Sequence, residues 1–159
     1  MSYSVYPAPS SGLTTSDLYT KWTQIDSKTA DGSSASINFT SIPSTYNQLK
    51  IVYRNLRHNG VPSGNAALRL TVNGSTTATD YLRNTVPSLG TLSDTITSVS
   101  FNFVDILDYT ISLNSKQIIS AQGLTTSFGY LQPTAISSLS VVCDQTLVEG
   151  TVTLWGGKY

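Results

Sequence analysis

The sequence is poor in charge and in the residues that favour helices. Only 11% of its 159 residues are charged, against about 25% in an average protein. Glutamate occurs once, at Glu149, and alanine occurs eight times. A long helical or coiled-coil protein needs Glu, Lys, Ala and Leu in quantity, so this composition excludes that class.

Excess charge of one sign, paired cysteines and long hydrophobic runs are also lacking. Nine Lys and Arg balance nine Asp and Glu, so no positive excess drives nucleic-acid binding. Cys143 is the single cysteine and cannot form an intrachain disulfide, which fits synthesis in a reducing compartment. No hydrophobic run approaches ~20 residues and no basic, apolar signal begins the chain, so we expect neither a membrane span nor a cleaved export signal.

Serine and threonine are abundant instead, with 24 and 22 copies. Threonine favours strands, and both residues keep an exposed strand face hydrated without charge. From about Lys21, short alternating runs are separated by turn residues, as in 67–72, where Leu68, Leu70 and Val72 share one face before Asn73-Gly74. This pattern predicts an all-β fold, an antiparallel β-sandwich of about eight strands over residues 21–159. The jelly roll is one common topology for such a sandwich, but the strand count does not determine the strand order.

Some strand boundaries stay open at this level. Trp22 and Gln24 alternate out of phase with Ile25, which leaves the register of the first strand undecided. The last two strands are expected at 136–143 and 150–155, joined by 144–149. A short strand is expected at 81–83, whereas the stretches around 57–64 and 84–94 are rich in turn residues and are predicted to be loops.

Residues 1–20 differ from the rest of the chain, because they combine prolines with tyrosines and show no sustained periodicity. We interpret this segment as an extended N-terminal arm. Four large side chains give it apolar area that a solvated tail would not need, so they are the predicted partner-binding residues: Tyr3, Tyr6, Leu13 and Leu18.

Candidate catalytic residues are few. His58 is the single histidine and lies in a predicted loop, and no nucleophile-elbow motif accompanies it. Asp105 and Asp108 form the closest carboxylate pair, but residues three apart in a strand point to opposite faces. One Cys and one His cannot make a four-ligand zinc site. We therefore expect no enzyme activity, no cofactor and no metal, a buried inert thiol at Cys143, and a small basic cluster at Arg54, Arg57 and His58.

Four segments of the chain resemble small virion proteins of tailed bacteriophages. Residues 36–51 match an I-x-F-x-x-I-P-x-x-Y-x-x-L strand–turn–strand pattern, and residues 68–74 match L-R-L-x-x-N-G followed by a tyrosine, Tyr81. Residues 135–141 and 150–158 are similar to the final I-T-S-I and G-S-x-x-x-L-Y-G-x-K patterns, with Trp155 where that family usually has Tyr. The middle section, 84–132, does not align.

The resemblance implies a phage structural protein with a jelly-roll-like sandwich, often trimeric. The leading interpretation is a capsid decoration, or cement, protein that binds the major capsid protein as a homotrimer and stabilises the shell. Its location would be the capsid surface of the virion, after synthesis in the host cytoplasm.

The alternative is a tail- or head-fibre domain that binds host-surface glycans. Aromatic side chains on an exposed face would then stack on sugars, and the candidates are Trp155, Tyr130, Tyr109 and Tyr81, although most of these are expected in the core.

Overall fold

The computed structural model describes residues 21–59, 65–82, 85–93, 101–110, 116–120 and 126–158. These residues confirm the expected all-β, jelly-roll-like antiparallel sandwich. The strands are β1 (Lys21–Thr29), β2 (Ser34–Phe39), β3 (Gln48–His58), β4 (Asn65–Val72), β5 (Ser88–Ser93), β6 (Phe101–Leu107), β7 (Lys116–Ser120), β8 (Thr126–Tyr130) and β9 (Leu139–Lys158). A 3₁₀ turn spans Ala78–Asp80. Within the described ranges, no helix has the length and apolar character needed to cross a bilayer.

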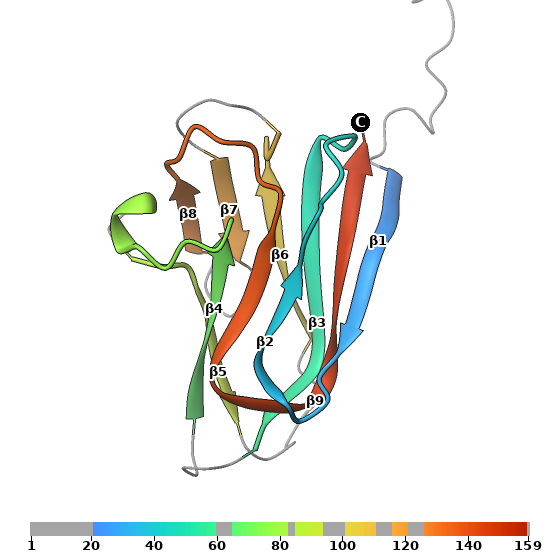
Figure 1. Ribbon diagram of the computed structural model, residues 1–159. Coiled ribbons are helices and arrows are strands. Elements are labelled where there is room, and N and C mark those ends of the chain that lie inside the picture. The colour runs from blue at the N-terminus through green and yellow to red at the C-terminus, as the bar shows by residue number, and fades with distance from the viewer. Residues whose placement is uncertain are drawn as a thin grey trace, which may run out of the picture.

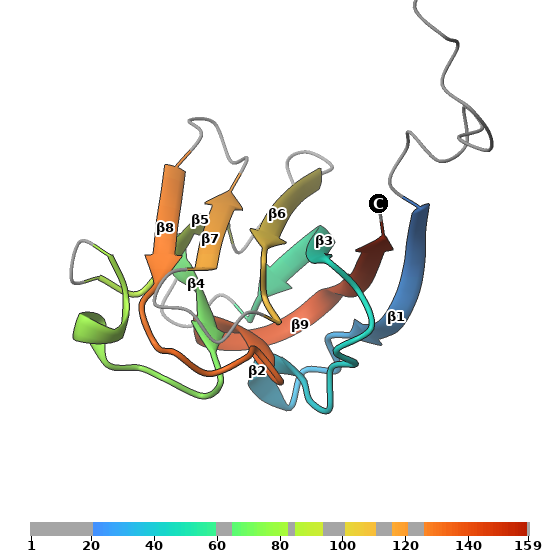
Figure 2. The same ribbon diagram turned by 90° about the horizontal axis from the view of Figure 1, so that it is seen from above.

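Strand β9 connects the two layers of the sandwich. Its first part pairs with β2 on one side and β4 on the other, and its second part pairs with β1 and β3. The path through the sheet is β5-β4-β9-β3-β6-β7-β8. In Figure 1, β9 descends through one layer, crosses at the bottom of the view and rises through the other. Figure 2 shows the resulting sheet curled into a half-barrel.

The core lies between the layers and follows the alternation of the strands. Successive side chains point to opposite faces of a strand, so every second residue is buried. In the regular part of β3 the alternation buries Leu49, Ile51 and Tyr53, and in β4 it buries Leu68, Leu70 and Val72. The first part of β9 contributes Leu139, Val141 and Cys143 to the same core.

The structure corrects two predicted breaks. The predicted connection at 144–149 lies inside β9, and Arg57 and His58 lie inside β3 instead of in a loop. The two strands keep pairing beyond a shift in register, with Arg57 opposite Glu149 and His58 opposite Leu147. Gly150 adopts φ 104° and Asn55 adopts φ 52° at this shift. Glycine adopts a positive φ without steric strain, so β9 bends at Gly150 and then continues.

The alternation of apolar residues in the sequence also failed to reveal two strands, β5 and β8, and it misplaced a third. Strand β5 lies in the predicted loop 84–94, and β8 was not predicted. The expected strand at 81–83 is reduced, within the described residues, to a single bridge from Tyr81 to Tyr130. The ambiguous phase around Ile25 is a real irregularity, because Gln24 pairs with Trp155 and Asp26 with Leu154, so Ile25 is an extra residue.

Two of the phage-like segments meet at the end of the sandwich where β1 begins and the described part of the chain ends. The ring of Tyr46 lies against Gly156, and the Lys158 Nζ lies 5.7 Å from the centre of that ring. The Asn47 N–H donates to the Gly157 carbonyl at 2.9 Å. The buried Tyr109 donates its hydroxyl to the Pro43 carbonyl. Through these contacts the I-P-x-x-Y stretch and the L-W-G-x-K stretch lie side by side in the folded chain, although they are far apart in the sequence.

The remaining phage-like segments are joined through Asn73. Its side-chain oxygen accepts from the Ser137 and Ser138 N–H groups at 2.8 and 3.1 Å, and its side-chain nitrogen donates to the Ala135 carbonyl. The Tyr81 hydroxyl accepts from the Val72 N–H and donates to the Ser75 carbonyl, which closes the same turn. Asn73-Gly74 is therefore a turn, as predicted, with φ 49° and 72°.

Candidate binding surface

The structure places the three residues considered for catalysis, His58, Asp105 and Asp108, in different parts of the fold. His58 was expected at the surface, but it is the last residue of β3 and only 1% exposed, because β9 continues beside it. Asp105 lies on β6, and its carboxylate is 3.4 Å from the Lys50 Nζ. Asp108 follows the end of β6, exposed and with φ 54°. The expectation that the chain is not an enzyme stays a prediction.

Metal-binding and thiol chemistry find little support in the described part of the chain. These residues contain no group of three or more His, Cys, Asp or Glu side chains that could hold a metal. Cys143 is 3% exposed and unpaired, and burial raises the pKa of its thiol, which confirms the prediction of a buried cysteine.

Lys116 is a buried cation away from these groups. Its Nζ donates to the Gln132 carbonyl at 2.8 Å and lies 5.6 Å from the centre of the Tyr130 ring. Burial lowers the pKa of the Lys116 ammonium, because the charged form loses hydration. Lys116 is the first residue of β7 and is paired with Tyr130 of β8, so its side chain belongs to the packing around these two strands.

Of the four aromatic residues considered for sugar binding, three are in the core, as expected. Tyr81, Tyr109 and Tyr130 are at most 3% exposed. Trp155 differs because it lies half-buried on the outer face of the second layer, beside Gln24 of β1 and Lys50 of β3. Trp155 is therefore the candidate that remains accessible.

Lys50 organises one side of this outer face. Its Nζ lies 4.5 Å from the centre of the Trp22 ring and 5.0 Å from that of Phe103, in addition to its contact with Asp105. A cation between two aromatic faces and a carboxylate holds the four side chains in fixed positions. Trp22 and Phe103 thus serve as packing for Lys50 on the outside of the sheet.

A groove of about 570 Å³ lies on the other side of Trp155. It runs over β1, β3 and the second part of β9, and its lining residues are Gln24, Val52, Arg54, Asn55, Glu149, Gly150, Thr151, Thr153 and Trp155. Its volume falls in the range of about 300–1,000 Å³ that is typical of small-molecule sites. The groove ends at the register shift, where Gly150 turns β9.

Charges of both signs stand at this groove. Glu149 accepts from the Nε of Arg57 at 3.1 Å and lies 2.9 Å from its Nη2, so the carboxylate is held by a two-point ion pair. Arg54 lies on the same outer face as Val52, two residues along β3. The predicted basic cluster is therefore divided: Arg57 pairs within the chain, His58 is buried, and Arg54 lines the groove.

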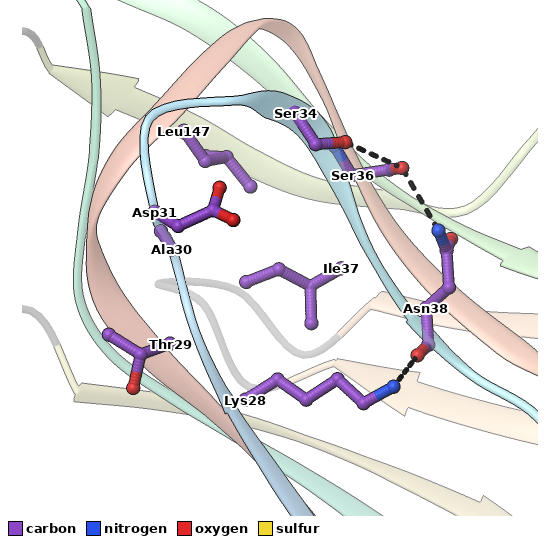
Figure 3. A pocket seen from close by; sticks show the side chains of 9 residues that line it. All are labelled: Lys28, Thr29, Ala30, Asp31, Ser34, Ser36, Ile37, Asn38 and Leu147. Atoms are coloured by element: carbon purple, nitrogen blue, oxygen red, sulfur yellow. Dashed lines mark hydrogen bonds between the residues drawn. The ribbon is translucent and has the colours of Figure 1, made fainter.

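A second hollow, of about 290 Å³, opens between β1 and β2 (Figure 3). Ile37 and Leu147 form its apolar part, and Lys28 donates to the Asn38 carbonyl at 2.6 Å across it. Ser34, Ser36 and the Asn38 side chain form a row of hydrogen bonds along its rim. Its lining carries no aromatic ring and its polar groups bond to one another, so it is the weaker candidate.

The predicted arm residues Tyr3, Tyr6, Leu13 and Leu18 lie outside the described residues. Sequence reasoning named Trp155 and Arg54 but missed Gln24, Asn55 and Glu149 as neighbours of Trp155. Only the pairing of β1 and β3 with β9 brings these residues together, although a glycine beside the single glutamate marks the irregular point in the sequence.

No protein-family model matches the chain, and no curated protein matches its sequence.

Proposed function

We propose that this chain is a structural protein of a tailed-bacteriophage particle, and specifically a capsid decoration protein that binds the outer shell as a homotrimer. The observation that carries the proposal is the convergence of the phage-like segments. Tyr46 packs on Gly156, Asn73 binds 135–138, and Tyr81 closes the turn between them. The resemblance thus follows contacts that hold the sandwich together, which supports a relationship over the parts of the fold that these segments form.

The surface chemistry is compatible with assembly. The chain has no net charge, and strands such as β1 and β9 expose hydroxyls, including the Ser27–Thr153 pair at 3.0 Å. Neutral hydroxyl faces pack against copies or a shell without strong repulsion. Lys21 pairs with Lys158, so the first described residue lies beside the last residues of β9. In the proposal, Tyr3, Tyr6, Leu13 and Leu18 anchor the arm on the major capsid protein or on a neighbouring copy.

The second candidate is a tail- or head-fibre domain that binds host-surface glycans. The groove beside Trp155 favours it, because an accessible aromatic ring and polar side chains adjoin there. The two candidates differ most in the number of copies on each particle.

The test is the copy number in purified particles, measured by quantitative mass spectrometry with the major capsid protein as internal standard. Hundreds of copies, in a multiple of three, support shell decoration, and a handful supports the fibre alternative. Absence from purified particles overturns both.

Arm variants test the mode of attachment. The chain without residues 1–20 retains β1 and should fold, but it should no longer bind the particles or raise their heat resistance. The quadruple change of Tyr3, Tyr6, Leu13 and Leu18 to serine should act in the same way. A matched variant with Ser2, Ser4, Thr14 and Thr15 changed to alanine should bind normally, and equal binding by all three variants would contradict the role of the arm.

A further inference from the structure

We propose that the groove between Trp155 and Glu149 binds a neutral saccharide. The inference goes beyond the proposed position on the capsid, because such a groove would serve a decoration protein as well as a fibre. On a shell with many copies, individually weak sites would act together on a surface rich in sugars.

The backbone at one end gives the groove its shape. The register of β3 and β9 shifts between Arg54 and Arg57, and Gly150 adopts a φ of 104° opposite Asn55. A Cβ atom at position 150 would lie 2.5 Å from the Asn55 carbonyl oxygen. The bend at this end of the groove therefore depends on backbone geometry.

The apolar part of the groove is formed by Trp155 and Val52. Both are half-buried and belong to the outer side of the β3–β9 ladder. On the side away from the groove, Lys50 is held by Trp22, Phe103 and Asp105. The C–H face of a pyranose ring is apolar and weakly positive, which suits the electron-rich face of the Trp155 indole.

The polar part combines donors and acceptors in one place. Arg54 supplies N–H donors, and Glu149 supplies carboxylate acceptors fixed by Arg57. Gln24 and Asn55 carry amides that both donate and accept, and the threonine hydroxyls of β9 do the same. Sugar hydroxyls also donate and accept, so they match this mixed lining.

The same mixture disfavours simple ions. A phosphate or sulfate needs donors alone, whereas this groove also presents the acceptor oxygens of Glu149, Gln24 and Asn55. A metal cation needs oxygen ligands and would be repelled by the guanidinium of Arg54. An uncharged ligand with an apolar ring face avoids both penalties, and a neutral sugar has this chemistry.

The primary test is a printed array of neutral and sialylated oligosaccharides, probed with the full chain. We expect selective capture by one or more neutral glycans. No binding by folded protein, or binding to sialylated glycans alone, would overturn the inference. Because the array uses no particles, its result is independent of the copy-number measurement. If no glycan is bound, the proposed position on the capsid still stands. If the copy number contradicts that position, the proposed saccharide site still stands.

Variants then locate the site by titration of the captured neutral oligosaccharide. Trp155→Ala should weaken binding at least tenfold, and Arg54→Ala and Gln24→Ala should each weaken it severalfold, with unchanged far-UV circular dichroism. Trp22→Ala is the matched control, because it removes the other tryptophan of the same face and lies outside the groove; its affinity should stay within twofold. Equal affinity of Trp155→Ala and the unmodified chain would overturn the assignment even if the array is positive.

A fluorescence measurement covers the case in which Trp155→Ala does not fold. The chain has two tryptophans, so Trp22→Phe leaves Trp155 as the single indole reporter. Saturating oligosaccharide should change its emission intensity and reduce quenching by iodide. Bound sugar with no change in either signal would contradict contact with Trp155.

Discussion

Strand β3 pairs over most of its length with the second part of β9, and the two ends of this ladder are built in different ways. At the closed end, defined by Tyr46, Gly156 and Lys158, an aromatic ring covers the inner side of β9 and the register is regular. At the open end, defined by Asn55, Glu149 and Gly150, the register shifts and the outer side forms a groove. Both ends need a glycine. Gly156 leaves room for the Tyr46 ring at the closed end, and Gly150 allows β9 to bend at the open end.

The contrast lies in the side chains, because the backbone at both ends depends on a glycine. Apolar packing and regular pairing make the closed end a part of the scaffold, whereas the open end exposes charged and amide side chains whose mutual contacts stabilise little.

The largest effect is expected from Gly150→Ala. The new Cβ would overlap the Asn55 backbone, and φ 104° is strained for any L side chain. We expect a loss of about 4 kcal/mol in the free energy of unfolding, or no folding, measured by urea denaturation. Gly74→Ala is the control, since φ is 72° but nothing lies within 4 Å; it should cost about 1 kcal/mol. Equal losses for the two variants would show that the open end is not sterically constrained.

The next largest effect is expected for Tyr53, a buried residue of β3 that lies between the closed end and the open end. Its hydroxyl donates to the Leu89 carbonyl at 3.0 Å, and burial raises its pKa to about 12. In the unfolded chain this phenol ionises near pH 10. The contribution of the neutral buried phenol is therefore complete below pH 10 and is lost as the pH rises toward 12, by roughly 2–3 kcal/mol in total.

Tyr53→Phe isolates that contribution. It should cost about 1 kcal/mol at pH 8, through the lost hydrogen bond. Its stability should then fall less steeply than that of the unmodified chain between pH 10 and 11.5, so that the difference narrows or reverses. Urea denaturation at several pH values measures this, and a difference that stays constant would contradict the prediction.

A smaller effect is expected from Gly156→Ala at the closed end. The new Cβ would overlap the Tyr46 ring, which must move and lose packing, for about 2 kcal/mol. Tyr46→Ala removes the obstacle, so the double variant should be at least about 1 kcal/mol more stable than the sum of the single changes predicts. Strict additivity in the double-mutant cycle would mean that ring and glycine are not coupled.

The smallest effect is expected for the Arg57–Glu149 pair at the open end. Both side chains are more than one-third exposed, so solvent screens their attraction. Arg57→Ala, Glu149→Ala and the double change should give a coupling energy below about 1 kcal/mol. A coupling of 2 kcal/mol or more would mean that this pair supports the fold, and the contrast between the two ends would weaken.

The strands predicted best are those with clean alternation. In 67–72 the apolar residues recur at every second position, and β4 buries Leu68, Leu70 and Val72 as expected. β5 and β8 were missed because their sequences, SLGTLS and TSFGY, contain glycine and few large apolar residues. These strands form because β4 and β7 offer them pairing partners, which local propensity does not reveal.

The candidate groove was predictable in part. Trp155 and Arg54 are conspicuous by residue type, but they are a hundred residues apart in the chain. The register of β3 and β9 decides that they share a face, together with Gln24 from β1. A shift of one residue would turn every one of these side chains to the other side of the sheet.

The sequence alone determined the all-β class, the turn at Asn73-Gly74 and the burial of Cys143, because alternation and turn chemistry act over a few neighbouring residues. The tertiary structure decided that residues 139–158 form one bent strand, that His58 is buried and that a groove lies beside Trp155. Those outcomes depend on pairing between distant segments. The free energy of such pairing is collected only when the whole sheet forms, so a short window of sequence cannot reveal it.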